Sequence, residues 1–432
     1  MLYLFKGESQ CPFRRNPPRG GEKIALAPNV DAFWPGNFAR LAMRGYIYGM
    51  NTVAIKPELL KWARERSSLS LQELEGSFPK YAHWESGCGE PTLKQLEALA
   101  KRTSTPFGYF FLLVPPEDKL SIQDFRTARG GRPRRPSPNL LETVQTMEQR
   151  QGWMRDYLLE QGVDKLAFVG ACTVASDPKA VAGDIRAELG KTRGWAGRHS
   201  TWEDAFRALR DAADEAGVMV FINGVVGNNT HRPLDVEEFR GFALVDDYAP
   251  LVFVNGHDAK GAQLFTLAHE LAHVWLGQGG VSNLEGLQPA DNQVERFCDQ
   301  VAAEFLVPEV ELKDVWPEFK GEDNPFPGLA RRFKVSQIVA ARRALDLGLI
   351  ARAEFFSFYN GYLEEVRSRN QDGKAGGDFY STQNNRLSQH FAGAVVRSAQ
   401  EGALLYREAY QLTNLYGSTF DKFAKGLEAC LA

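Results

Sequence analysis

Cysteine is scarce in this chain of 432 residues, and its placement excludes two common roles. The cysteines are odd in number and far apart: Cys11, Cys88, Cys172, Cys298 and Cys430. Such an arrangement indicates neither a disulfide framework nor a Cys-X-X-Cys metal site. Because disulfide frameworks are typical of oxidising compartments, their absence predicts a cytoplasmic protein.

Long apolar runs and an excess of one charge are also missing. No run of about eighteen apolar residues is present that could span a membrane, and the beginning of the chain lacks the apolar stretch of a secretory signal. The 51 Lys and Arg nearly balance the 54 Asp and Glu, which leaves a net charge of −3. No overall affinity for membranes or nucleic acid is therefore expected, and any DNA binding must come from a local surface.

The sequence does contain the motif His269-Glu270-Leu271-Ala272-His273, within the stretch 265–277. Residues four apart on a helix project from one face, so both imidazoles can reach one metal ion. Zinc held by two histidines and a carboxylate keeps a position for water and lowers the pKa of that water, while a nearby carboxylate can take its proton. We therefore predict that His269 and His273 bind Zn²⁺ and that Glu270 is the base of a metallopeptidase.

A third ligand is predicted on a second helical stretch. Zinc sites that resemble the site of thermolysin take this ligand from a glutamate on a downstream helix, and Glu295 lies 22 residues (295 − 273) after His273. Asp299 follows four residues later, on the same helix face. We expect its carboxylate to accept the outer N–H of a ligating histidine, which fixes the tautomer of that ring and raises its basicity.

The two segments 265–273 and 295–308 together resemble the ImmA/IrrE family of bacterial and phage metallopeptidases. The second motif of that family usually runs Glu-x-x-Ala/Cys-Asn-x-x-Ala-Ala-x-Leu-Leu-Met-Pro. This chain has the corresponding residues Cys298, Asp299, Ala302, Ala303, Leu306, Val307 and Pro308. The resemblance covers roughly the second half of the chain and implies zinc-dependent peptide hydrolysis. Asp299 departs from the asparagine that is common in the family, which changes the hydrogen bonding around the ligands.

Short amphipathic helices with strong start signals are predicted between residues 50 and 113. Pro57 opens the first helix, and Ser70 with Glu73 forms a capping box at the second. With the Trp-Glu-Ser-Gly segment at 84–87, this pattern resembles the XRE-type helix-turn-helix domain. The resemblance implies binding of DNA.

The candidate DNA-reading side chains lie on the expected recognition helix: Lys80, Tyr81, His83 and Ser86. Residues 51–113 contain eight Lys and Arg and seven Asp and Glu, so the net charge of +1 (8 − 7) is low for a phosphate-binding surface. A helix-turn-helix fold retained as a protein-binding or dimerisation module is the alternative, and both interpretations stay open.

The predicted fold class is α+β and mostly helical, with a helix-turn-helix bundle, a zincin-like peptidase domain with a small sheet, and a helical C-terminal region. Apolar runs at 218–222, 241–245 and 251–254 predict the strands, and the edge of such a sheet can hold an extended peptide. The predicted segments are a flexible extension (1–49), the XRE-like domain (50–116), a basic linker (117–138), the zinc metallopeptidase domain (139–326) and the helical C-terminal region (327–432).

Two points about the ends of the chain stay open. Met50 precedes the regular sequence and is an alternative start to Met1. Near the C-terminus, a group of apolar residues forms either core or the surface of a homodimer: Leu404, Tyr406, Tyr410 and Leu412.

The predicted function is that of a cytoplasmic zinc endopeptidase fused to a DNA-binding domain. We expect it to cleave a regulatory protein, such as a transcriptional repressor or the product of a neighbouring gene, in stress or mobile-element control. The alternative is an antitoxin-like or transcriptional regulator that binds a partner protein and operator DNA without turnover. No membrane partner is expected.

Overall fold

The computed structural model describes residues 52–126, 135–282, 292–369 and 386–431, which fall into two compact units, the first ending at Asp118. The predicted extension at 1–49 and the choice between Met1 and Met50 lie outside the described residues. Within the described ranges, no helix has both the length and the apolar character needed to cross a bilayer.

The first unit consists of short helices around a small apolar core. Its elements are α2 (Pro57–Arg66), α3 (Leu71–Ser77), α4 (Tyr81–Glu85), α5 (Leu93–Arg102) and the 3-10 helix η1 (Phe107–Phe111). The predicted capping box is confirmed, because the side chains of Ser70 and Glu73 each accept the backbone N–H of the other. Arg64 joins α2 to α4 by donating two hydrogen bonds of 2.8 Å to the carboxylate of Glu85.

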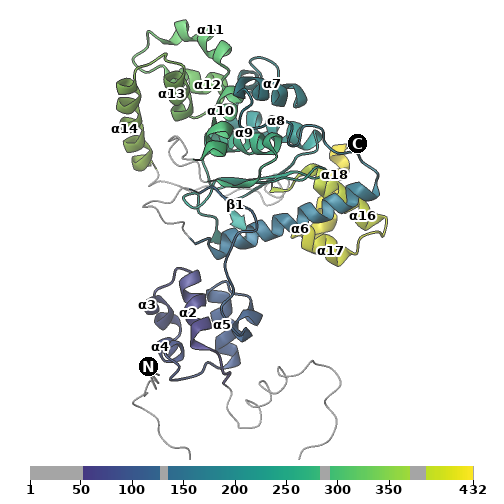
Figure 1. Cartoon of the computed structure of the whole chain (residues 1–432). Helices are drawn as coiled ribbons and strands as arrows, with labels where there is room; N and C mark the ends of the chain where they lie inside the picture. Colours follow the sequence, from purple (N-terminus) through teal and green to yellow (C-terminus); the bar gives the residue numbers. More distant parts are fainter. Residues whose placement is uncertain (1–51, 127–134, 283–291, 370–385, 432) are drawn as a thin grey trace, which may run out of the picture. The chain divides into compact units, whose positions relative to one another are not determined.

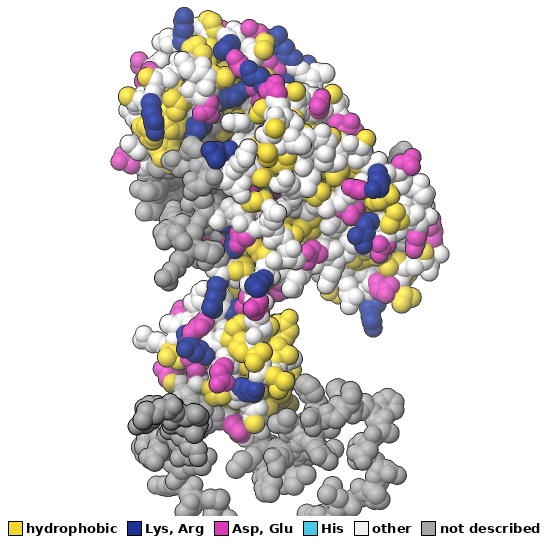
Figure 2. All heavy atoms as spheres, in the orientation of Figure 1, with side chains coloured by type: hydrophobic (Ala, Val, Ile, Leu, Met, Phe, Trp, Pro, Cys, Tyr) yellow, Lys and Arg dark blue, Asp and Glu magenta, His cyan; other side chains and the backbone are white. Residues whose placement is uncertain are grey.

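Several large apolar side chains of this unit remain exposed: Leu71, Leu93, Phe107, Leu112, Leu113 and Val114. In the view of Figure 2, hydrophobic side chains gather on one side of the unit. The segment 107–116 packs on the helices only in part, since Phe110 is 1% exposed and Leu113 is 80% exposed.

The second unit is built on a mixed sheet of five strands in the order β1-β7-β5-β6-β2. These strands are β1 (Gln123–Asp124), β2 (Met219–Asn223), β5 (Gly241–Leu244), β6 (Leu251–Asn255) and β7 (Gly280–Ser282). The pairs β1 with β7 and β2 with β6 are parallel, whereas β5 pairs antiparallel with both of its neighbours. A separate antiparallel pair follows β2, formed by β3 (Val225–Val226) and β4 (Asn229–Pro233). The three predicted strands correspond to β2, β5 and β6.

Helices cover both faces of this sheet (Figure 1). One face carries α7 (Pro178–Glu188), α8 (Trp202–Glu215), α9 (Lys260–Leu276) and α10 (Gln293–Leu306). Four further helices add side chains to the core on this face: α11 (Glu309–Phe319), α12 (Phe326–Phe333), α13 (Gln337–Asp346) and α14 (Arg352–Arg369). The other face carries α6 (Pro138–Glu160), α16 (Gln389–Gln400), α17 (Tyr406–Thr413) and α18 (Ser418–Leu431). A short 3-10 helix, η2 (Ala196–Arg198), lies between α7 and α8.

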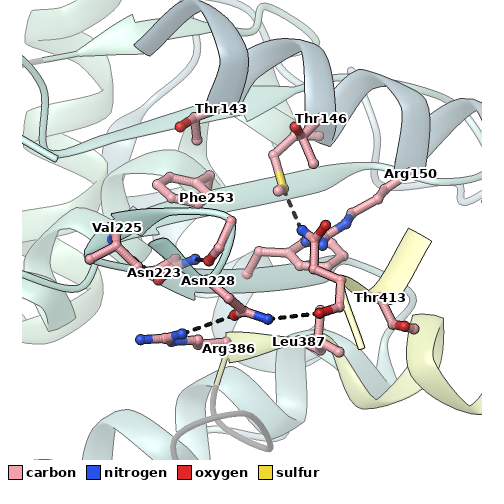
Figure 3. A pocket seen from close by; sticks show the side chains of 14 residues that line it. Thr143, Thr146, Arg150, Asn223, Val225, Asn228, Phe253, Arg386, Leu387 and Thr413 are labelled. Carbon is pink, nitrogen blue, oxygen red and sulfur yellow. Dashed lines mark hydrogen bonds between the residues drawn. The ribbon is translucent and has the colours of Figure 1, made fainter. Parts of the chain in front are cut away.

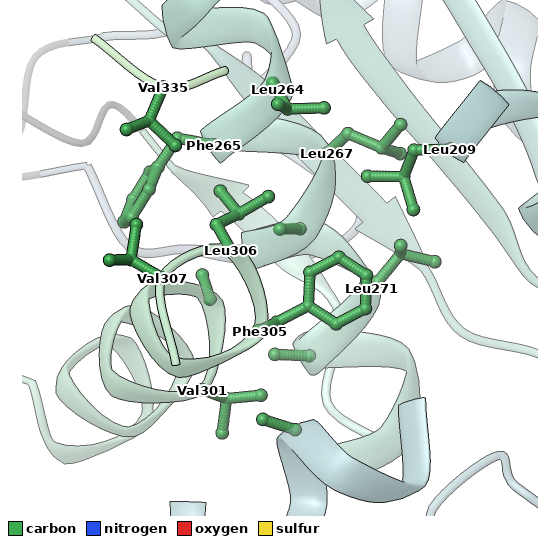
Figure 4. Close-up of a cluster of buried hydrophobic side chains, with 14 of the residues drawn as sticks. Leu209, Leu264, Phe265, Leu267, Leu271, Val301, Phe305, Leu306, Val307 and Val335 are labelled. Atoms are coloured by element: carbon green, nitrogen blue, oxygen red, sulfur yellow. The ribbon is translucent and has the colours of Figure 1, made fainter. Parts of the chain in front are cut away.

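The alternation of side chains along the strands separates two hydrophobic cores. Val220 and Val252 face the core around α9, while Phe221 and Phe253, next to them in sequence, face the core around α6. Figure 4 shows the first core, in which side chains of α9 and α10 interdigitate below the sheet. Complete burial of a leucine such as Leu271 contributes roughly 1.5–3 kcal/mol, so this packing holds the two helices firmly together.

Two predicted domain boundaries differ from the packing of the second unit. The boundary at residue 326 falls inside one core, because Phe326, Leu329 and Val335 are buried together with the apolar side chains of α9 and α10. The predicted linker at 117–138 contributes β1 to the sheet of the second unit, and its residues 127–134 lie outside the described ranges. Sequence composition could not indicate either point, since both depend on contacts between distant segments.

The apolar group near the C-terminus belongs mainly to the core. Leu404 is buried in the core around α6, and Tyr410 and Leu412 pack partly against it. Tyr406 is 49% exposed and remains the member of this group that a partner could cover.

Candidate metal centre

Helix α9 holds both predicted ligand histidines in the interior of the second unit. It ends at Gly277, whose backbone is left-handed (φ 72°), a conformation that L side chains rarely adopt. The last turn is fixed from outside as well, since the N–H of Gly170 donates to the carbonyl of Val274 at 3.1 Å. The helix end at Gly277 and the hydrogen bond from Gly170 therefore together set the position of His273, which lies in this last turn.

The three predicted ligands converge. Nε2 of His269 lies 3.1 Å from Nε2 of His273. Glu295, from α10, places one carboxylate oxygen 3.4 Å from Nε2 of His269 and the other 3.0 Å from Nε2 of His273. All three ligand atoms lie within 4.8 Å of one another, and the three side chains are buried. The structure thus brings together His269, His273 and Glu295 from two helices.

The outer nitrogen of each histidine lies close to an oxygen atom. Nδ1 of His273 donates to the carbonyl of Gln278 at 2.8 Å, and Nδ1 of His269 lies 3.0 Å from Oδ1 of Asp299. With the proton on Nδ1, the lone pair of Nε2 in each ring points toward the other ring and Glu295. Asp299 thus lies next to His269 as predicted, although the two atoms do not form a well-directed hydrogen bond.

This group of residues fits a divalent metal ion. Oε1 of Glu295 is buried and receives no well-directed hydrogen bond from the nearby rings. Burial raises the pKa of Glu295, but the two histidines lower it more strongly, to about 2. Burial lowers the pKa of His269, but Glu295 and Asp299 raise it well above its ordinary value. The centre therefore favours an added positive charge, and two imidazoles with one carboxylate are a ligand set that suits Zn²⁺.

Glu270 lies beside the histidines and is fully buried. Its Oε1 accepts a hydrogen bond of 2.6 Å from the hydroxyl of Ser282 on β7, while Oε2 has no hydrogen-bond partner. Burial raises the pKa of this carboxyl, and the neighbouring histidines oppose that rise. One oxygen of Glu270 is thus held in place and the other remains available to accept a proton.

Gly241 on β5 leaves the room that Glu270 needs. A Cβ atom at position 241 would lie 2.6 Å from Cγ2 of Thr266 and 3.0 Å from Oε1 of Glu270. Since real Cβ atoms do not approach other atoms so closely, a side chain here would displace α9 from the sheet.

The segment that contains β1 also contacts the metal centre. Phe125 follows β1 and stacks on His273, with 5.6 Å between ring centroids and an interplanar angle of 17°. A Cβ atom at Gly280 would lie 2.3 Å from the Phe125 ring, so a glycine is needed there for this contact. Arg126 is paired with Asp124 at 2.6 Å and with Glu238 at 3.1 Å, which anchors the segment.

Sequence reasoning did not identify Phe125, Ser282 or Gly241 as parts of this centre. Their contacts join strands that are far apart in the chain, and no local pattern indicates them. The carbonyl of Gln278 could have been found, because Gly277 is a helix-ending signal and the next carbonyl lies near the last turn.

The candidate DNA-reading residues of the first unit are only partly available. Tyr81 is buried, and its hydroxyl donates to the carbonyl of Leu60 at 2.7 Å, so the prediction that Tyr81 reads bases is wrong. Its aromatic ring fills the core between α2 and α4. Lys80, His83 and Ser86 are exposed.

We predict that Asp299→Asn keeps the fold and weakens zinc binding by roughly tenfold to a hundredfold, the range typical of residues that orient a ligand. An amide is a weaker acceptor than a carboxylate for the Nδ1 proton of His269, so the imidazole becomes a poorer donor to the metal. Competition with a chromophoric chelator measures the affinity. Asp421→Asn, at an exposed position of α18, is the control. Equal zinc affinity in wild type and Asp299→Asn would exclude this role.

The fold and the centre together define a metallopeptidase-like domain. Residues 213–345 match the model of the IrrE N-terminal-like domain (Peptidase_M78), a segment that contains every residue of the centre except Phe125. This match supports an ImmA/IrrE-type domain in this part of the chain. Residues 387–426 match a domain of unknown function (DUF8813). No curated protein matches the chain.

Proposed function

We propose that the protein is a zinc-dependent endopeptidase that cleaves a regulatory protein. The observation that carries this proposal is the convergence of His269, His273 and Glu295 next to the buried carboxylate of Glu270. The match of residues 213–345 to a peptidase family supports hydrolysis of a peptide bond as the reaction.

In this proposal each residue of the centre has one task. His269, His273 and Glu295 would hold Zn²⁺, which would supply a Lewis acid for the peptide carbonyl and would lower the pKa of water. Glu270 takes up the proton of the attacking water through its free oxygen and then gives it to the departing amine. Ser282 keeps that carboxylate in place by donating to the other oxygen.

The proposed substrate is a transcriptional repressor or the product of a neighbouring gene, as the resemblance to ImmA/IrrE peptidases implies. We propose a cytoplasmic location, because Cys172 and Cys298 are free thiols. Regulation of stress genes or of a mobile element is consistent with such a substrate.

We also propose that the first unit contacts DNA through α4. The exposed side chains of Lys80, His83 and Ser86 support this role. A mobility-shift assay with the protein's own promoter region tests it, and Lys80→Ala should weaken binding while the helices stay folded. Unchanged binding in Lys80→Ala would favour a protein-binding module.

Incubation of the purified full chain with the product of the neighbouring gene tests the proposed function. We expect zinc-dependent cleavage into discrete fragments, because the metal and Glu270 act together on one peptide bond. A metal chelator should stop the reaction, and added zinc should restore it. Gel electrophoresis and mass spectrometry identify the fragments and the bond that is cut.

The same incubation separates the two classes of function. A stable complex that forms in the presence of chelator, without any cleavage, would support a regulator that binds its partner without turnover. Cleavage that continues at full rate after complete removal of metal would contradict the proposed mechanism.

A further inference from the structure

A second polar site lies on the opposite side of the sheet from helix α9. It is a small hollow, partly open to solvent, between α6, the strands β2 and β6, the β3–β4 pair and the segment from residue 386 onward. Phe221 and Phe253 form part of its wall, and Arg150 and Arg386 enter it from different parts of the chain (Figure 3). None of the residues of the metal centre lines it.

Arg150, on α6, brings a buried positive charge to this hollow. The residue is 5% exposed, its Nε donates to the carbonyl of Leu412 at 2.8 Å, and its guanidinium lies over the ring of Phe221 at 5.1 Å. Burial alone lowers the pKa of Arg150, to about 10. Among the described residues, no carboxylate is paired with this guanidinium, although buried charges are normally paired.

Arg386 adds a second guanidinium to the same hollow. It is partly buried, and its Nη1 donates to Oδ1 of Asn228 at 3.1 Å. Burial lowers its pKa as well. No Asp or Glu is among the described residues that line the hollow, so two positive charges share it without a negative one.

Several other polar groups around the hollow have used their hydrogen-bond donors elsewhere. The hydroxyls of Thr143, Thr146 and Thr413 each donate to a carbonyl of their own helix, at 2.7–2.8 Å. The amide of Asn228 donates to the carbonyl of Asn414 at 2.7 Å. Among the described residues that line the hollow, the charged N–H groups are those of the two arginines.

A purely structural role explains only part of this arrangement. The bond from Arg150 to the carbonyl of Leu412 ties α6 to α17, and the aromatic rings offset some of the lost hydration. Neither contact neutralises the positive charge of Arg150, and Arg386 adds a second positive charge to the hollow. A guanidinium is suited to binding carboxylate and phosphate oxygens, because its N–H groups form a planar fork.

We propose that this hollow binds a small oxyanion, the carboxylate or phosphate group of a small molecule, between Arg150 and Arg386. The anion accepts N–H bonds from both guanidiniums and supplies the negative charge that the described lining lacks. The apolar wall formed by Phe221 and Phe253 contacts the remainder of the ligand. This site is independent of the proposed peptidase activity.

Isothermal titration calorimetry of the full chain with inorganic phosphate, and separately with succinate, tests the proposal. We expect saturable binding of one anion per chain, and the better of the two probes identifies the chemical class. Arg150→Gln and Arg386→Gln should each weaken that binding by about tenfold or more, since each removes one charged donor. Arg155→Gln is the matched control, because Arg155 lies on the same helix and is 47% exposed; its affinity should equal that of wild type.

The proposal is overturned if wild type binds neither phosphate nor succinate saturably, or if both arginine variants bind as tightly as wild type. Thermal unfolding with and without the anion checks the folding of each variant. If Arg150→Gln fails to fold, Arg386→Gln decides the outcome, because its side chain is less buried and its loss disturbs the core less.

Discussion

Replacing Glu270 by glutamine is expected to abolish peptide hydrolysis while the metal content stays at one ion per chain. Glutamine has nearly the same shape, and its amide oxygen can still accept the hydrogen bond from Ser282. It cannot take up a proton at neutral pH, so the base is lost and the three metal ligands remain. Loss of a general base lowers rates by roughly a hundredfold to ten-thousandfold. The cleavage rate and the zinc content of the same preparation measure the two effects.

Glu203→Gln provides the control for this experiment, because Glu203 is an exposed residue of α8 and should leave both quantities unchanged. Two results would count against the assigned role. A cleavage rate within a few fold of wild type would mean that another group is the base. Loss of zinc together with activity would mean that Glu270 mainly holds the centre together.

The local parts of the centre could be predicted from sequence because they follow from helix geometry. His269 and His273 are four residues apart, and Glu295 and Asp299 are four residues apart, so each pair shares a helix face wherever the helices lie. That the two faces meet was inferred from the resemblance to a family. The structure has them meet, with carboxylate oxygens of Glu295 within 3.4 Å of both rings.

The parts that could not be predicted depend on packing between distant segments. Tyr81 has the polar hydroxyl of a surface residue, yet its ring fills the core and its hydroxyl is satisfied by a backbone carbonyl. Phe125 lies in a stretch whose glycines and arginines suggest a linker, but its pairing with β7 makes it part of the centre. Arg150 lies on α6, and only the fold reveals that its charge is buried and that no carboxylate of the described residues is paired with it.

Replacing Glu295 by glutamine is expected to remove zinc from the purified protein. The change deletes the negative ligand and leaves two neutral imidazoles, so the loss of affinity should exceed the roughly hundredfold upper limit for residues that only orient a ligand. Elemental analysis measures the metal, and Glu188→Gln, at the exposed end of α7, is the control. A variant that keeps one zinc per chain would exclude Glu295 as a ligand.

The pH dependence of zinc binding gives a separate test of the same residue. In the metal-free protein, the lowered pKa of Glu295 contributes stability above the ordinary carboxyl pKa, and this contribution is lost as the pH falls toward about 2. The raised pKa of His269 contributes stability below the ordinary imidazole pKa, and this contribution is lost as the pH rises through the raised value.

Zinc requires a neutral His269, so binding must displace the proton that Glu295 and Asp299 stabilise on that ring. The apparent zinc affinity of wild type should therefore still rise with pH at the ordinary imidazole pKa of about 6.5, and it should level off only above the raised pKa of His269. In Glu295→Gln the strongest acceptor for that proton is gone, and the remaining weak affinity should reach its plateau at lower pH. Chelator competition at several pH values measures both curves. If the two curves rose over the same range, the charge of Glu295 would not control the protonation of His269.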